Sequence, residues 1–261
     1  MERQIRIKLR YYRWHVDPGV EWAETNTGYA QLDWEIPISQ AGLVLVDVWD
    51  RHYLKDTEAR AEAIIQEKIV PLVSACREVG LQIIHAPSPK LAKEHPAWVQ
   101  LIEDKSSPGS RSEDWPPADF RSKSGIYKAY ARPVEPREEE RSKHVSALTM
   151  HPLVQPEGDD VVIATGQELH RYCKQEGILF LFYLGFNTNA CILLRDYGTL
   201  RMHERGYEII IVRDCGTGME SFETHDQLWQ TRGAILFLEM FRKYSISSEE
   251  LMSGIQPADT R

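Results

Sequence analysis

Five short apolar segments, spaced among helical ones, constrain the fold of this chain more than any other feature. They are residues 41–47 (AGLVLVD), 81–86, 161–164, 178–185 and 207–214. Strands of a parallel sheet are buried on both faces, so they consist of continuous apolar runs. Segments with helical periodicity lie between and after them, at residues 57–80, 166–177, 191–206 and 225–244. This order predicts an α/β protein with a doubly wound, mainly parallel, Rossmann-like sheet and helices on both faces.

The N-terminal residues 1–40 precede this alternation and have a different pattern. Ile5, Ile7 and Leu9 alternate with charged residues, and a period of two predicts a strand. Residues 28–38 form either its partner strand or an extended arm.

The segment from about 104 to 150 is rich in Ser, Pro, Arg and Glu. It nevertheless contains four aromatic residues, Trp115, Phe120, Tyr127 and Tyr130. It is either a solvated surface excursion or, because aromatic side chains favour burial, a cap over the active edge or a subunit contact. We expect a single domain over residues 1–261, with the N-terminal extension and this insert attached.

Charge and hydropathy exclude several classes of protein. The net charge of −8 gives no general attraction to nucleic acid or to an anionic membrane. No apolar run approaches the roughly 20 residues that span a bilayer. Charges are scattered over residues 1–15, so we expect no secretory signal and a cytoplasmic location. In that reducing compartment we expect no disulfide framework, with Cys76, Cys173 and Cys215 unpaired.

Polar side chains follow several of the predicted strands at their carboxyl ends. They are Asp47, Trp49, Asp50 and His52 after the first strand, His85 at the second, GFNTNAC (185–191) at the fourth, and Asp214 and Cys215 at the fifth. Ligands of open parallel sheets bind at this edge. We therefore expect these residues to line one edge of the sheet.

Cys191 and Asp47 are the candidates for chemistry at that edge. Cys191 begins a predicted helix directly after a buried strand, where free N–H groups and the helix dipole favour a thiolate and can stabilise an oxyanion. The alternatives are a cysteine that only packs and a carboxylate that only caps or forms an ion pair. Together the two residues form a plausible nucleophile and base.

Three segments resemble the isochorismatase-like cysteine hydrolases, a family that includes nicotinamidases and N-carbamoylsarcosine amidohydrolases. LVLVDVWD (43–50) is similar to the family's first strand with its catalytic aspartate. Residues 185–218 are similar to its Gly-x-x-Thr-x-x-Cys turn, helix and following strand, and THDQ (224–227) is similar to the start of its last helix. The resemblance covers residues 41 to 244 approximately and implies a three-layer sandwich.

The resemblance implies a nucleophilic Cys191 and Asp47 as the base that takes and returns the thiol proton. It also implies an oxyanion hole formed by the backbone N–H groups of Asn187 and Cys191, and a cis peptide between Phe186 and Asn187. Four further residues are candidates for binding the substrate: Trp49, His52, Thr188 and Asn189. Each of the four also has a structural alternative, as a core or turn residue.

One departure from the family concerns its catalytic lysine, which follows the strand that matches residues 161–163. VVIATGQEL contains no lysine, and the loop is short. Lys123, Lys128 and Lys143 lie in the insert and are candidates to replace the catalytic lysine. The alternative for each is a solvated lysine at the surface. We predict a Cys191–Asp47 pair whose third position is filled by a neutral or unrelated group.

Metal and nucleotide cofactors are not expected. The family's Asp-x-His motif is absent from HAPSPKLAKEH, and His85 and His95 alone do not form a site. Glycine-rich nucleotide-binding motifs do not follow any predicted strand.

These observations predict a cytoplasmic, homo-oligomeric hydrolase of small molecules, acting on C–N bonds of amide, ureide or carbamoyl compounds through a covalent Cys191 intermediate. Two alternatives remain. One is a non-catalytic binding or scaffold protein on a retained hydrolase fold, suggested by the missing lysine. The other is vinyl-ether hydrolysis of the isochorismatase type, for which a nucleophilic cysteine is not required.

Overall fold

The computed structural model describes residues 3–101 and 116–256 of the chain. It divides the chain into two compact units, one of Met1–Gln100 and Leu148–Arg261 and one of Leu101–Ala147. Trp115 of the insert lies outside the described residues. In the described part, no helix is long and apolar enough to cross a membrane.

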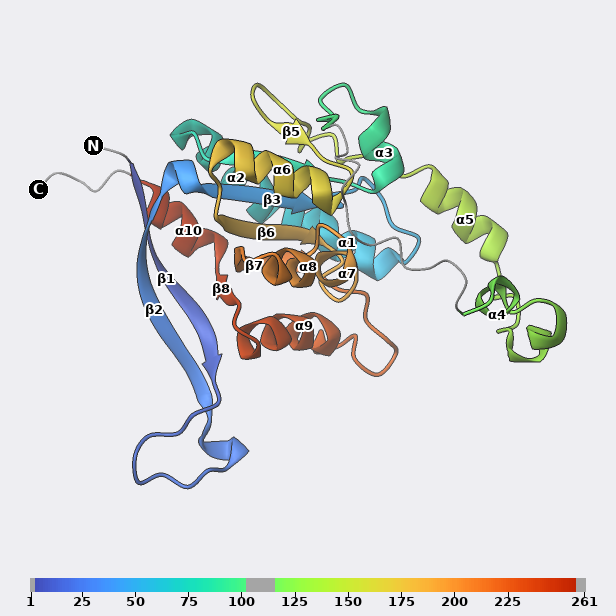
Figure 1. Cartoon of the computed structure of the whole chain (residues 1–261), viewed down its shortest axis with the longest axis horizontal. Coiled ribbons are helices and arrows are strands. Elements are labelled where there is room, and N and C mark those ends of the chain that lie inside the picture. Colours follow the sequence, from blue (N-terminus) through green and yellow to red (C-terminus); the bar gives the residue numbers. More distant parts are fainter. Residues whose placement is uncertain (1–2, 102–115, 257–261) are drawn as a thin grey trace, which may run out of the picture. The chain divides into compact units, whose positions relative to one another are not determined.

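The first unit is built on an eight-stranded sheet in the order β2-β1-β8-β7-β6-β3-β4-β5, counted over the described residues (Figure 1). Strands β3 to β8 are parallel to one another, whereas β1 is antiparallel to both β8 and β2. The strand bounds are β1 Gln4–Arg13, β2 Gly28–Pro37, β3 Ala41–Val46, β4 Gln82–Ala86, β5 Val161–Val162, β6 Phe180–Phe186, β7 Glu208–Thr217 and β8 Tyr244–Ile246. The predicted α/β class and mainly parallel sheet are confirmed.

Helices cover both faces of this sheet: α1, α2 and α10 lie on one face, and α6, α8 and α9 on the other (Figure 1). All six residues of β3 are buried, as its apolar run predicts. A five-residue π-helical turn, Ile65–Ile69, joins α1 to α2. The helix bounds are α1 Lys55–Ile64, α2 Val70–Val79, α3 Pro89–Glu94, α6 Gly166–Glu176, α7 Cys191–Leu194, α8 Thr199–Glu204, α9 Trp229–Met240 and α10 Ser248–Ile255.

The predicted helix over residues 191–206 is wrong, because the structure breaks it in two. The first part, α7, has only four residues, and Arg195 after it adopts an extended ψ of 157°. Gly198 permits the turn between the parts, since a Cβ there would lie 2.9 Å from the carbonyl oxygens of Arg195 and Ile192. Apolar residues continue with helical spacing on both sides of the break, so the pattern alone does not reveal it.

The C-terminal end also differs from the prediction. Helix α9 begins at Trp229 rather than at 225, and the THDQ segment forms turns. Strand β8 and helix α10 were not predicted, because three residues give too short a pattern for a strand. A capping box does mark the start of α10, where the Ser247 side chain accepts from the Glu250 N–H.

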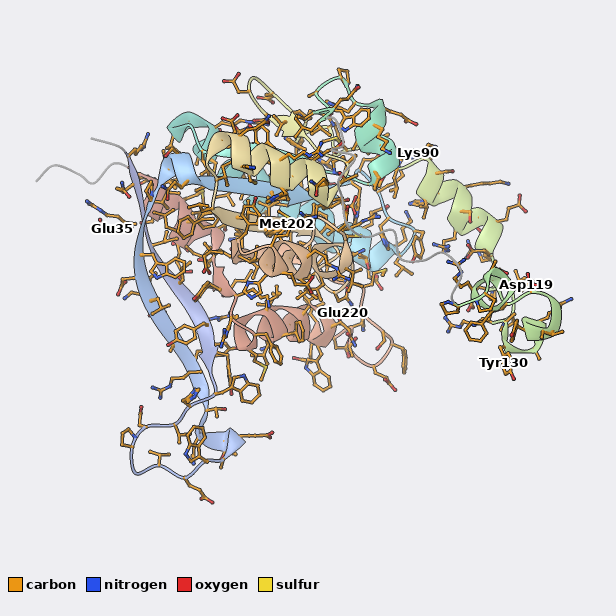
Figure 2. All side chains as sticks on the ribbon, in the orientation of Figure 1. Glu35, Lys90, Asp119, Tyr130, Met202 and Glu220 are labelled. Atoms are coloured by element: carbon orange, nitrogen blue, oxygen red, sulfur yellow. The ribbon has the colours of Figure 1, made fainter. Side chains whose placement is uncertain are left out.

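The N-terminal extension forms a two-stranded ribbon, so its second half is a partner strand. Strands β1 and β2 pair from Gln4 with Pro37 to Arg13 with Gly28. Ile5, Ile7 and Leu9 are buried as the alternation predicts, whereas charged side chains such as Glu35 point outward (Figure 2).

The second unit contains α4 (Ala118–Ser122), a 3₁₀ helix (Gly125–Tyr130) and α5 (Glu138–Ser146). Phe120 and Tyr127 make an edge-to-face contact at 5.2 Å between ring centroids, and the Lys123 ammonium lies over the Phe120 ring. Tyr130, labelled in Figure 2, is 69% exposed. Whether this unit caps an active site or contacts another subunit stays a prediction.

Replacing Gly185 tests how β3 and β6 are joined. Gly185 has a φ of +115°, and a Cβ there would lie 2.0 Å from the Val46 carbonyl oxygen. We expect Gly185→Ala to lower the free energy of unfolding by about 2 kcal/mol or more, measured by urea denaturation. The control is Gly233→Ala at an exposed position of α9, where no atom lies within 4 Å of the added Cβ. It should stabilise the protein by about 0.5–1 kcal/mol, and equal effects of the two substitutions would contradict the prediction.

Candidate active site

The carboxyl ends of β3 and β6 bring the two candidate residues together. Val46 pairs with Gly185 in parallel register, so the segments that follow leave the sheet side by side. Asp47 comes directly after β3, and the turn that ends in Cys191 follows β6. The two side chains interact directly although they are far apart in the sequence, and each shifts the pKa of the other.

Asp47 is a buried carboxylate with three partners. It is 9% exposed, and burial raises its pKa above the ordinary value. The Cys191 thiol, the Arg195 guanidinium and the main-chain N–H of Ser88 all favour its charged form. Arg195 Nη2 lies 3.4 Å from Asp47 Oδ2. A carboxylate of raised pKa is a better proton acceptor than an exposed one, provided that it remains ionised.

The Cys191 thiol is protonated at neutral pH, contrary to the expected thiolate. Burial and the negative charge of Asp47 raise its pKa to about 11, whereas Arg195 and the Asn187 N–H lower it. The expectation rested on a full helix beginning at Cys191, but α7 is four residues long. Burial and the neighbouring carboxylate therefore outweigh the stabilisation that so short a helix gives.

The turn before Cys191 has the predicted cis peptide between Phe186 and Asn187. The Asn187 N–H lies close enough to the Cys191 sulfur to lower the pKa of the thiol, while the Asn187 carbonyl accepts from the N–H groups of Ala190 and Ile192 at 3.0 and 3.3 Å. One of the two N–H groups expected to form an oxyanion hole is therefore next to the sulfur. The oxyanion hole itself remains a prediction.

The four candidate substrate-binding residues all make contacts within the protein. Trp49 is buried against Phe186 with 4.9 Å between ring centroids, and His52 Nδ1 accepts from the Leu54 N–H. The Thr188 N–H donates to Thr217. The Asn189 amide makes two hydrogen bonds to the main chain of Met219, at 2.8 and 3.1 Å. Asn189 thus holds the segment that follows β7. A role of any of the four residues in substrate binding stays a prediction.

Three further residues expected at this edge are bonded elsewhere. Asp214 lies within β7 and accepts two hydrogen bonds from Ser248 of α10, both 2.7 Å, and Cys215 is buried in the core. The expectation failed because β7 continues to Thr217. His85 is buried and pairs with Asp160 at 3.1 Å.

A cavity of about 610 Å³ lies near the ends of β3 and β4 and does not include Cys191 or Asp47 among its lining residues. It is lined by Asp50, Leu91, His95, Thr149, Met150, His151, Pro152 and Gln155. In the described ranges, 3–101 and 116–256, no group of three His, Cys, Asp or Glu side chains could hold a metal ion. The four cysteines are all free, as expected for Cys76, Cys173 and Cys215.

Arg195 is the residue of the site that sequence reasoning missed. It follows Cys191 by four positions and interacts with both Cys191 and Asp47. Of the two expected alternatives for the third position, a neutral group is therefore wrong, and the structure brings an unrelated residue there, a cationic arginine. The available signal was the position of Arg195 four residues after Cys191. On the continuous helix that was predicted for residues 191–206, this position gives no reason to expect contact with Asp47. Lys123, Lys128 and Lys143 belong to the second unit.

Comparison with known proteins assigns the family. Residues 41–236 match the model of the isochorismatase domain, which is most of the chain. The chain therefore belongs to the isochorismatase family of hydrolases. Among curated proteins, no sequence matches it significantly.

The chain is also similar to solved structures, all at low sequence identity. A cysteine hydrolase from Pseudomonas syringae pv. phaseolicola is 15% identical with a TM-score of 0.51, over 85% of this chain and 95% of that one. An isochorismatase from Pseudomonas putida is 14% identical with a TM-score of 0.49, over 82% and 91%. An isochorismatase-like hydrolase from Alkaliphilus metalliredigens is 14% identical with a TM-score of 0.48, over 83% and 99%.

Alkylation of Cys191 tests the electrostatics of the site. With a thiol pKa of about 11, the iodoacetamide rate should rise about tenfold per pH unit between pH 7 and 10. Asp47→Asn removes the negative neighbour, so it should lower the pKa and speed alkylation at pH 8 by about tenfold. Mass spectrometry locates the label. The other three thiols are buried, and burial raises the pKa of Cys76 and Cys173 to about 12. Unchanged or slower labelling of Asp47→Asn would contradict this account.

Proposed function

We propose that this protein is a cysteine-dependent hydrolase of C–N bonds in small amide, ureide or carbamoyl compounds. The observation that carries the proposal is the direct interaction of the Cys191 thiol with the buried Asp47 carboxylate at the carboxyl edge of the sheet. A nucleophile in contact with a base, beside a main-chain N–H donor, is the arrangement that acyl transfer needs. Membership of a hydrolase family supports the same reading.

In the proposed first step, the Cys191 sulfur attacks the substrate carbonyl carbon while Asp47 takes the thiol proton. The carbonyl oxygen becomes an oxyanion, which the N–H groups of Asn187 and Cys191 stabilise. The tetrahedral intermediate collapses, the C–N bond breaks, and Asp47 returns the proton to the leaving nitrogen. The products of this step are ammonia or an amine and a thioester on Cys191.

In the second step, water attacks the thioester carbon and Asp47 accepts a proton from it. The C–S bond then breaks, and the proton returns to the sulfur. The net reaction is amide plus water to acid plus amine, which needs no oxidant or reductant. Because the pKa of the thiol is about 11, proton transfer to Asp47 must accompany the attack rather than precede it.

The contact between Cys191 and Asp47 favours catalysis over a scaffold role, because a residue that only packs has no need of a buried carboxylate partner. It also favours a covalent route over vinyl-ether hydrolysis, which requires no nucleophilic thiol. We further propose that the enzyme is cytoplasmic, homo-oligomeric and acts without a cofactor.

Removing the thiol is the decisive test. A panel of amides, ureides and carbamoyl compounds is screened for ammonia release, and Cys191→Ala is then assayed on the best substrate. We expect turnover to fall by at least about 10³-fold with an unchanged melting temperature. Intact-protein mass spectrometry of the wild type should detect the acyl adduct.

Cys173→Ala is the matched control, because it removes a thiol of α6 that is buried away from Asp47, and it should keep its activity. Full turnover by Cys191→Ala would contradict covalent catalysis. A failure of all substrates, together with an ordinary thiol pKa near 8.5, would favour the scaffold alternative.

Chelation provides a separate test. The described residues hold no cluster with metal-ligand geometry, so activity should be unchanged after dialysis against EDTA. Activity that disappears on dialysis and returns with zinc or iron would show that residues distant in the sequence form a metal site.

A further inference from the structure

We propose that Arg195 is a catalytic residue that supplies a fixed positive charge to the Cys191–Asp47 pair. This inference rests on the proposed function, since it concerns the same site. It goes beyond that function in assigning a third group to the reaction and in stating what that group can and cannot do.

The contacts of Arg195 place its charge at the reacting atoms. Its guanidinium lies 3.4 Å from Asp47 Oδ2, and it also interacts with the Cys191 side chain. The side chains of Arg195 and Asp47 are 35% and 10% exposed. Burial alone would lower the pKa of Arg195, but Asp47, Tyr197 and Cys191 together raise it above its ordinary value, so the guanidinium stays charged. Dissolved salt screens the attraction between two such partly buried charges less than it screens the attraction between two charges at the surface.

The backbone that carries Arg195 is held on several sides. The neighbouring Tyr197 is fully buried, and its hydroxyl donates to the Pro87 carbonyl at 2.8 Å. Its own carbonyl accepts from the hydroxyl of Tyr183 at 2.8 Å. Asp196 Oδ2 accepts from the Gly166 N–H at the same distance. Arg195 therefore approaches Asp47 from a fixed support rather than from a free loop.

The loop after β5 accommodates this support. A Cβ at Gly166 would lie 2.1 Å from the Asp196 carbonyl oxygen, so the two segments are in close contact only because residue 166 is glycine. The same loop, residues 161–168, contains no lysine or arginine. Residues 161–168, which contain no cation, are thus packed against the segment that contains Arg195.

Arginine restricts what this third group does. Its guanidinium stays protonated throughout the accessible pH range, so it cannot donate or accept a proton in the reaction. All proton transfer is left to Asp47. The charged or titratable groups facing Arg195 are Asp47, Cys191, Tyr197 and, next in the chain, Asp196. Burial raises the pKa of Tyr197 far above neutrality, so it stays neutral. The resting pair of Asp47 and Arg195 therefore has no net charge.

A fixed cation here has two effects on the reaction. It makes the sulfur easier to deprotonate, because it stabilises negative charge on the thiolate. It also attracts the negative charge that develops on the attacked carbonyl, an effect that is strong in a water-poor site. Neither effect depends on the identity of the leaving nitrogen.

The test measures alkylation of Cys191, which needs no substrate. The rates of reaction with iodoacetamide at pH 8.5 are compared for Asp47→Asn and for the double variant Asp47→Asn/Arg195→Gln. Because neither variant has an ionisable side chain at position 47, loss of Arg195 cannot act through a change in the ionisation of that residue. We expect the double variant to react about tenfold more slowly, because loss of the cation raises the thiol pKa by about one unit. The preference for anionic iodoacetate over neutral iodoacetamide should fall as well. Arg195→Lys should restore most of the rate.

Arg201→Gln is the matched control, since Arg201 lies on α8 and pairs with Glu204 at the surface, with 2.9 Å between the charged atoms. It should leave the rate and the reagent preference unchanged. Equal rates and equal reagent preference in the two Asp47→Asn backgrounds, with folding verified by circular dichroism, would overturn the proposal.

The outcome is separable from that of the proposed function. If Cys191→Ala still hydrolyses the substrate but Arg195→Gln slows alkylation, the cation acts on the thiol and the covalent mechanism fails. If Cys191→Ala is inactive but Arg195→Gln changes neither alkylation nor kcat, the inference about Arg195 fails by itself.

Discussion

The pairing of β3 with β6 is the interaction on which the site depends. Gly185 allows the Val46 carbonyl to approach within a distance that a side chain would prevent. Because the strands are parallel, both end at the same edge, and Asp47 meets the turn that carries Cys191. The long apolar runs that bury these strands thus have a chemical consequence, since they fix where a carboxylate and a thiol leave the sheet.

Burial sets the protonation state of the site. It raises the pKa of both Asp47 and Cys191, and the mutual effect of the two groups raises that of the thiol further. A thiol that keeps its proton until a carbonyl arrives reacts little with other electrophiles. In the mechanism we propose, the site differs from cysteine sites that store a thiolate beside a cationic histidine, because the proposed proton acceptor, Asp47, is an anion. The positive charge comes from Arg195, and it offsets Asp47 instead of accepting the proton.

Most of the fold could be predicted from sequence because long, two-sided apolar runs are strong patterns. The segment of β3 and the alternation of Ile5, Ile7 and Leu9 both had the expected structure. The short elements could not be predicted in this way: β8 has three residues, and the break after α7 depends on a close approach at Gly198. The same break explains why Arg195 was missed. Its contact with Asp47 is a property of tertiary packing, and no local spacing specifies it.

The close approach at Gly166 has a consequence for how this sequence can vary. Any side chain at position 166, or added residues in the loop after β5, would displace Asp196 and with it the backbone of Arg195. The loop after β5 and the segment that carries Arg195 therefore constrain each other, although they are about thirty residues apart in the sequence. A substitution in either segment that disturbs this contact would also disturb the position of the cation beside Asp47.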